Sequence, residues 1–124
     1  MNLARSVALA VALVVSSGSA VLAQDFDRGL DAYNAQDYAT AFKEWKPLAE
    51  RGLVNAQVGL GILHTIGDGF PEDYKEAARW FRLAAEQGDD FAQYNLGVLY
   101  DDGLGVPQDH KEAARWYKRA AEKG

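Results

Sequence analysis

Apolar residues recur every three or four positions through most of the chain. In the stretch DDFAQYNLGVLYDDG, residues 89–103, the residues Ala92, Leu96 and Leu99 fall on one side of a predicted helix. The sequence GLGVPQD that follows contains two glycines and a proline, which predict a turn. A second helix is predicted over residues 109–124. The pattern therefore indicates two helices joined by a turn.

The same pattern occurs twice at a spacing of 36 residues. Aligning residues 53–88 with residues 89–124 without a gap gives identical residues at 19 of 36 positions. Residues 24–52 form a shorter, divergent version of this unit, with Pro47 inside the second helix, where it should kink the chain. Self-similarity at a fixed period is typical of repeat architectures, and about three units are needed for a continuous core. The sequence therefore predicts an all-α chain of about three helix–turn–helix units.

Aspartate side chains are placed where the predicted helices begin. Asp73 and Asp109 each precede a glutamate by three residues, a variant of the capping box. Asp89 or Asp90 is expected to cap the helix that follows it. Gly88 ends the preceding helix and suits a left-handed backbone position there.

Two glycines, Gly61 and Gly97, occupy the middle of the first helix in the two full units. Glycine in a helix interior costs on the order of 1 kcal/mol relative to alanine. The expected compensation is close contact with the second helix of the same pair, whose aromatic residues fill the space between hairpins. A Gly97→Leu change is therefore expected to be far more damaging than an exposed substitution.

The first residues follow a different pattern. Residues 1–23 carry one positive charge at Arg5, an apolar run at 7–15, and small residues near Ala23. This arrangement is typical of a secretory signal peptide, so we expect a mature chain that begins at Gln24 and is periplasmic or secreted. The apolar run is shorter than the roughly 20 residues that a membrane-spanning helix needs. An uncleaved N-terminal anchor is the alternative.

Composition excludes several classes of function. The sequence contains no cysteine, so no disulfide stabilises the fold and stability must come from packing. The formal net charge of −5 gives no electrostatic basis for binding nucleic acid or an anionic membrane surface. No linker or low-complexity tract divides residues 24–124. We interpret them as one domain with units at 24–52, 53–88 and 89–124.

The stretch AQYNLGVLYDDGLGVPQDHKEAARWYKRAAEKG, residues 92–124, resembles a SEL-one-like repeat, a relative of the tetratricopeptide repeat. The resemblance rests on an A-x-x-x-L-G-x-x-Y helix, a G-x-G-V loop and an A-x-x-W-Y-x-x-A-A helix. The second unit departs from this pattern at His64, Phe70 and Phe81. The resemblance implies a right-handed, curved α-solenoid that serves as a scaffold for protein–protein contacts. Exported bacterial members are similar to adaptors and regulators at the cell envelope.

Residues suited to catalysis are sparse. All four serines lie within residues 1–23 and no cysteine is present, so the predicted mature chain lacks both common nucleophiles. His64 and His110 lie in different units without the spacing of metal ligands. His64 stands at a tyrosine position of the repeat and is interpreted as a packed residue. We therefore predict no enzymatic activity, no metal and no cofactor.

The candidate binding surface is a second apolar stripe on the first helices of the units. Ala56, Leu60 and Leu63 supply the core stripe of the second unit and leave further apolar residues on a different side. Neighbouring helices could cover this second stripe, or it could form an open groove for a helix or extended segment with a basic end. The residues assigned to it are Val58, Ile62, Ile66, Tyr94, Val98, Asp101 and Asp102.

The predicted partner is another protein or a peptide segment, bound at this concave face. The alternative function is binding or hydrolysis of a cell-wall glycan or peptide in the same groove. The last helix carries Trp116 and Tyr117 without a polar capping helix after it, so this end is expected to pack on a second copy of the chain, end to end, or on a partner. The alternative is that Lys118, Glu122 and Lys123 make the outward side polar enough by itself.

Overall fold

The computed structural model describes residues 22–123 of the chain. These residues form six helices, and no strand occurs among them. The first helix is described over residues 22–34. The predicted signal peptide, residues 1–23, lies almost wholly outside the described residues, so export stays a prediction. The other helices are α2 (Tyr38–Glu50), α3 (Val54–Ile66), α4 (Tyr74–Glu86), α5 (Asp90–Asp102) and α6 (His110–Lys123).

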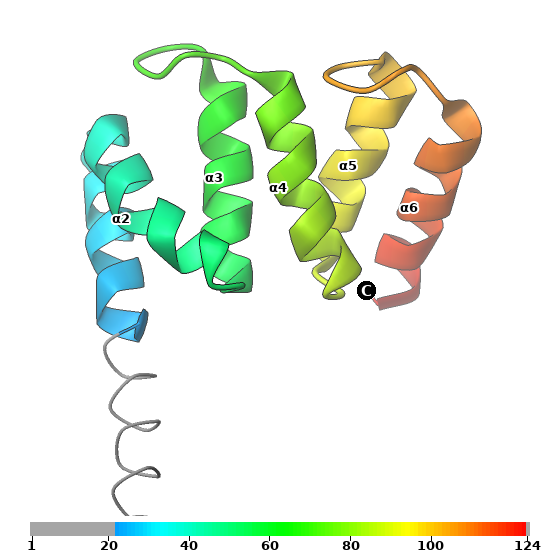
Figure 1. Ribbon diagram of the computed structural model, residues 1–124. Helices are drawn as coiled ribbons and strands as arrows, with labels where there is room; N and C mark the ends of the chain where they lie inside the picture. The colour runs from blue at the N-terminus through cyan, green and yellow to red at the C-terminus, as the bar shows by residue number, and fades with distance from the viewer. Residues whose placement is uncertain (1–21, 124) are drawn as a thin grey trace, which may run out of the picture.

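The helices stand side by side in the order of the sequence (Figure 1). The main contacts join consecutive helices, from α2 with α3 through to α5 with α6. The two longer loops, after α3 and after α5, lie at the same edge of the array (Figure 1). This arrangement confirms the predicted all-α solenoid of helix pairs.

The predicted helix caps are present. The side chains of Asp73 and Asp109 accept hydrogen bonds from the backbone N–H groups three residues later, both at 3.1–3.2 Å. Of the two candidates for the start of α5, Asp89 is the cap and accepts from the Ala92 N–H at 2.8 Å. Gly88 has a φ of 98°, which confirms the left-handed position expected there.

Pro47 lies inside α2, as predicted. Proline has no N–H to donate within the helix, and its ring pushes against the preceding turn. Figure 1 shows that α2 changes direction along its length. The first unit therefore differs in shape from the two units that follow.

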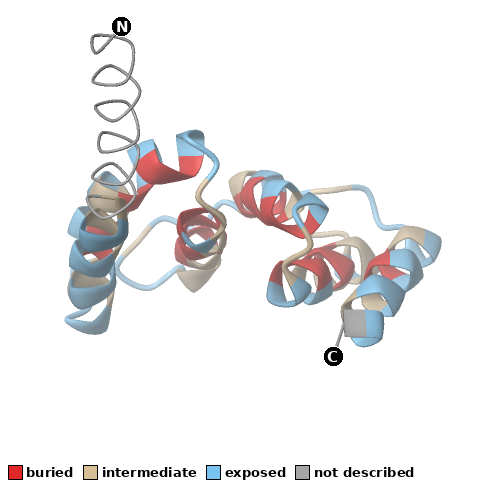
Figure 2. Cartoon of the chain, turned by 90° about the horizontal axis from the view of Figure 1, so that it is seen from below, coloured by how far each residue is buried: buried red, intermediate tan, exposed pale blue. Residues whose placement is uncertain are grey.

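Two clusters of buried residues make up the core, and α4 belongs to both. Trp80 packs with Trp45 and Leu60 in the N-terminal cluster. The adjacent Phe81 packs with Leu96 in the C-terminal cluster. Figure 2 shows that buried residues gather where consecutive helices face each other, whereas the outer sides are exposed. The array is held together by contacts between neighbours, as in other repeat proteins.

The glycines in the first helices allow the expected close approach. A Cβ atom added at Gly61 would lie 2.6 Å from the Phe81 ring, and one at Gly97 would lie 2.6 Å from the Tyr117 ring. Each glycine thus makes room for the aromatic residue of the second helix in its own pair. This close contact was predicted from the sequence.

Candidate interaction groove

A hollow of about 250 Å³ runs across the first helices of all three units. The helix over residues 22–34 and α3 supply most of its wall, and α5 supplies one edge. The lining is almost entirely apolar and aromatic. Its residues are Phe26, Leu30, Tyr33, Trp45, Asn55, Val58, Gly59, Ile62, Asp89 and Phe91.

Trp45 of α2 fixes the N-terminal wall of the groove. Its indole Nε1 donates a hydrogen bond to the Phe26 carbonyl oxygen at 3.0 Å. Its ring stacks on Phe26 with 5.5 Å between centroids. Trp45 itself is buried, so its indole N–H needs an acceptor, and this bond supplies one. The first helix is thereby held in place against the second.

Several apolar side chains that line the groove remain exposed to solvent. Leu30 is 40% exposed and Phe91 is 49% exposed. Val58 and Ile62 are half-buried and also contact the C-terminal core cluster. Phe91 rests edge-on against Phe81, with 6.5 Å between ring centroids. Exposed aromatic and aliphatic residues gathered in one hollow are typical of interaction sites.

The residues of the predicted apolar stripe do not all lie in one place in the structure. Val58 and Ile62 line the groove. Ile66 packs against the N-terminal core cluster instead. Tyr94 is exposed and lies against the Tyr117 ring at 5.5 Å, in a second hollow between α5 and α6. Val98 is half-buried and does not belong to the groove lining. Partner binding at these residues stays a prediction.

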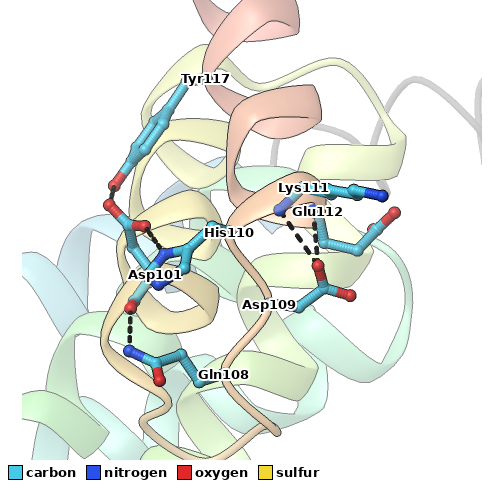
Figure 3. Close-up of polar contacts among 7 residues, drawn as sticks. All are labelled: Asp101, Gln108, Asp109, His110, Lys111, Glu112 and Tyr117. Carbon is cyan, nitrogen blue, oxygen red and sulfur yellow. Dashed lines mark hydrogen bonds and ion pairs between the residues drawn. The ribbon is translucent and has the colours of Figure 1, made fainter.

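Asp101 has a structural role in the fold. Its Oδ1 lies 2.6 Å from His110 Nδ1, and its Oδ2 accepts a hydrogen bond from the Tyr117 hydroxyl at 3.5 Å (Figure 3). Its backbone oxygen accepts from Gln108 Nε2 at 2.9 Å. Burial and the nearby Asp101 carboxylate raise the pKa of Tyr117. Asp101 thus ties α5 to α6, while Asp102 is exposed at the end of α5.

Several groove residues were missed by the sequence reasoning. Phe26, Leu30 and Tyr33 lie at i, i+4 and i+7, which is a helical stripe that could have been found. They were overlooked because the first unit matches the repeat poorly. Phe91 stands where the previous unit has Asn55, so the repeat itself gives no signal for it.

His64 is buried, which confirms its interpretation as a packed residue. Its ring lies between Phe42 and Phe70, at 5.9 and 5.4 Å between centroids. Neither ring nitrogen has a hydrogen-bond partner among the described residues. Burial lowers the pKa of His64, because the charged form would lose its hydration.

Among residues 22–123, no three histidine or carboxylate side chains lie close enough together to hold a metal ion. No helix in this part of the chain has both the length and the apolar character needed to cross a membrane.

Residues 54–89 and 90–124 each match the model of the Sel1 repeat. These bounds begin one residue later than the predicted units. The fold resembles the crystal structure of c5321, a protective antigen present in uropathogenic Escherichia coli strains, with 39% sequence identity and a TM-score of 0.81. A Sel1 repeat protein from Oxalobacter formigenes is 30% identical, with a TM-score of 0.73.

The matched relatives differ in length from this chain. The similarity to c5321 covers 87% of this chain and 24% of that protein. For the Oxalobacter protein the values are 80% and 30%. The chain thus spans less than a third of either relative.

Helicobacter pylori cysteine rich protein B shares the fold at 19% identity, with a TM-score of 0.65 and coverage of 84% and 89%. A search among curated protein sequences gave no match. The two repeat matches together with the solenoid of helix pairs place this chain in the Sel1 repeat family.

Proposed function

We propose that this chain is an exported interaction scaffold whose groove holds an apolar segment of another protein at the cell envelope. Sel1 repeats are commonly scaffolds for protein–protein interaction. The observation that carries the proposal is the exposure of Leu30 and Phe91 in one apolar hollow. Burial of such side chains by a partner contributes favourable free energy in proportion to the apolar area removed from water.

The chemistry of the lining supports an apolar protein segment as the partner. The polar groups of the lining are the Asn55 amide, the Tyr33 hydroxyl and the Asp89 carboxylate, which already caps α5. A sugar ring needs many hydrogen-bonding groups around it, which this lining does not offer. A helix or extended segment with two or three apolar residues suits it better. A basic residue at one end of that segment would lie near Asp89.

The groove can be tested by removing its exposed apolar side chains. Leu30→Asp and Phe91→Asp each place a carboxylate where the partner would be buried, so capture of the partner should fall at least about tenfold. Both positions are exposed, so circular dichroism should report unchanged helix content. Capture is measured by crosslinking in the native compartment followed by mass spectrometry.

Leu83→Asp is the matched control. Leu83 lies on α4, is 38% exposed and is not part of the groove lining, so this variant should capture the partner normally. Undiminished capture by both groove variants would move the binding site elsewhere. Groove protection by a cell-wall fragment without any protein partner would favour glycan or peptide binding instead.

A further inference from the structure

The charged residues of this chain are divided unevenly between its two sets of helices. The first helices of the three units, which are residues 22–34, α3 and α5, carry six aspartates and one arginine. The second helices, α2, α4 and α6, carry ten lysines or arginines and six glutamates. The set of helices that builds most of the groove wall is therefore acidic, whereas the other set is basic.

The arginine on the first helices is already paired. Among residues 22–34, 54–66 and 90–102, Arg28 is the one lysine or arginine. Its Nη1 lies 3.1 Å from Asp25 Oδ1, on the same helix. The positive charge of Arg28 is therefore balanced by its own neighbour, and the other aspartates of these helices leave the groove side of the array negatively charged.

Two carboxylates stand at the groove itself, on different elements. Asp89 precedes α5, lines the groove and is half-buried. Asp27, on the helix over residues 22–34, lines an adjoining hollow of about 380 Å³ that shares Phe26 and Asn55 with the groove. Among the described residues, no lysine, arginine or histidine forms an ion pair with either carboxylate. Both charges are thus available to a bound molecule.

An apolar segment that fills the groove must also satisfy Asp89. Its Oδ2 accepts a hydrogen bond from the Ala92 N–H at 2.8 Å, so the cap of α5 holds this side chain in place. A covering segment removes water from the carboxylate, and an unpaired buried carboxylate costs free energy. A lysine or arginine of the segment offsets that cost with a charge-assisted hydrogen bond. A carboxylate at the same place would add repulsion between like charges.

We propose that the groove selects cationic segments of other proteins, in which lysine or arginine residues stand on both sides of the apolar residues. One cation meets Asp27 and the other meets Asp89. The inference rests on the proposed function and adds the charge of the partner to it.

The remaining aspartates of the first helices act at longer range. Their summed field attracts a cationic segment and repels an acidic one as it approaches the groove. Salt screens interactions between exposed charges, so this selectivity weakens as the ionic strength rises. The dependence on salt therefore separates the electrostatic contribution from the apolar contacts, which salt of this kind does not remove.

The probe is a phage-displayed library of random peptides of about 12 residues, selected on the immobilised protein. The test variant is Asp27→Asn/Asp89→Asn, which removes both charges, and asparagine at position 89 can still cap α5. The matched control is Asp31→Asn/Asp37→Asn, which changes the net charge equally. Asp31 is exposed on the same helix as Asp27, and Asp37 caps α2 by accepting from the Thr40 N–H at 3.2 Å. Neither control residue lines the groove or the adjoining hollow.

The selected peptides should contain lysine or arginine on both sides of their apolar residues. In fluorescence anisotropy, Leu30→Gln should weaken their binding at least about fivefold, because it removes an apolar contact without adding charge. Asp27→Asn/Asp89→Asn should weaken it at least about threefold at low ionic strength, and about 0.5 M salt should remove most of this difference. The control variant should bind within about twofold of the unmodified protein. Circular dichroism should report the same helix content for all the variants.

Selected peptides that require Leu30 but show no excess of lysine and arginine would overturn the inference and leave the proposed function standing. Equal weakening by the two double variants would also overturn it, because the effect would then come from the net charge of the protein and not from Asp27 and Asp89. Peptides that bind the Leu30→Gln protein equally well, or a selection that yields no peptide at all, would contradict the groove as a binding site and the inference with it.

Discussion

His64 is the one histidine in the described residues that is buried, and its environment predicts how stability depends on pH. Burial lowers its pKa, and the charge of Lys46 acts in the same direction, whereas Glu76 and Asp73 oppose the shift. The unfolded chain binds a proton near pH 6.5, while the folded chain keeps the ring neutral to a lower pH. The stability that this difference supplies is fully present above pH 6.5. It is lost progressively as pH falls from 6.5 towards the folded-state pKa.

The test is a His64→Phe variant. Urea unfolding at about pH 7.5 and about pH 5 should show a smaller loss of stability on acidification than in the unmodified chain. The corresponding residue of the last unit is Tyr100, so an aromatic ring suits the position. An unchanged pH dependence in His64→Phe would contradict the assignment.

Gly97 tests the close approach of α5 and α6. Gly97→Ala gains helix propensity but brings Cβ to 2.6 Å from the Tyr117 ring, so the ring must move. Gly97→Leu adds three more carbon atoms there and should cost at least the roughly 1–3 kcal/mol of an overpacked core. Ala39→Leu, at an exposed helical position, should change stability by less than about 0.5 kcal/mol. Denaturant unfolding measures both, and equal effects would contradict the packing described.

The sequence alone predicted the structural roles of several single residues. Helix caps such as Asp73 depend on chemistry within three residues, which the sequence contains in full. The role of Gly97 was also readable, because a costly residue at the same place in two units implies a contact. The role of Asp101 was not readable, because it needs His110 and Tyr117 to arrive from another helix.

Between elements, one glutamine in each full unit joins consecutive pairs of helices. Gln93 is 2% exposed and donates to the Ala85 carbonyl oxygen. Gln93→Glu removes this donor and buries a carboxylate, so it should lower the free energy of unfolding by about 1–3 kcal/mol or more. Gln108→Glu, at an exposed site, should have a much smaller effect. Urea unfolding measures the stability of both variants. If Gln93→Glu loses no more stability than Gln108→Glu, the role of Gln93 is contradicted.

The position of the helices relative to one another explains why only part of the predicted stripe lines the groove. Val58 and Tyr94 occupy equivalent repeat positions, yet Val58 faces the groove and Tyr94 faces the second hollow. Periodicity identifies the side of a helix on which a residue lies. It does not identify which neighbouring helix packs against that side, because the first and last units have different neighbours from the middle unit.

For the whole molecule, export is the prediction that remains. Cleavage after Ala23 would leave Phe26, Leu30 and Tyr33 on the mature chain, so the groove would stay intact. Expression of the full sequence should yield a periplasmic or secreted protein whose intact mass corresponds to a first residue at Gln24. A mass that still includes residues 1–23 would contradict cleavage and favour an N-terminal anchor.

The central claim is that the groove binds a protein segment, and site-specific photo-crosslinking tests it most directly. A photoreactive phenylalanine analogue replaces Phe91 at the edge of the groove, and in a second protein it replaces Leu83 on α4. After irradiation in the native compartment, we expect one discrete protein adduct from position 91, which Leu30→Asp removes, and no adduct from position 83. Adducts of equal yield from both positions, or an adduct from position 91 that Leu30→Asp leaves unchanged, would contradict it.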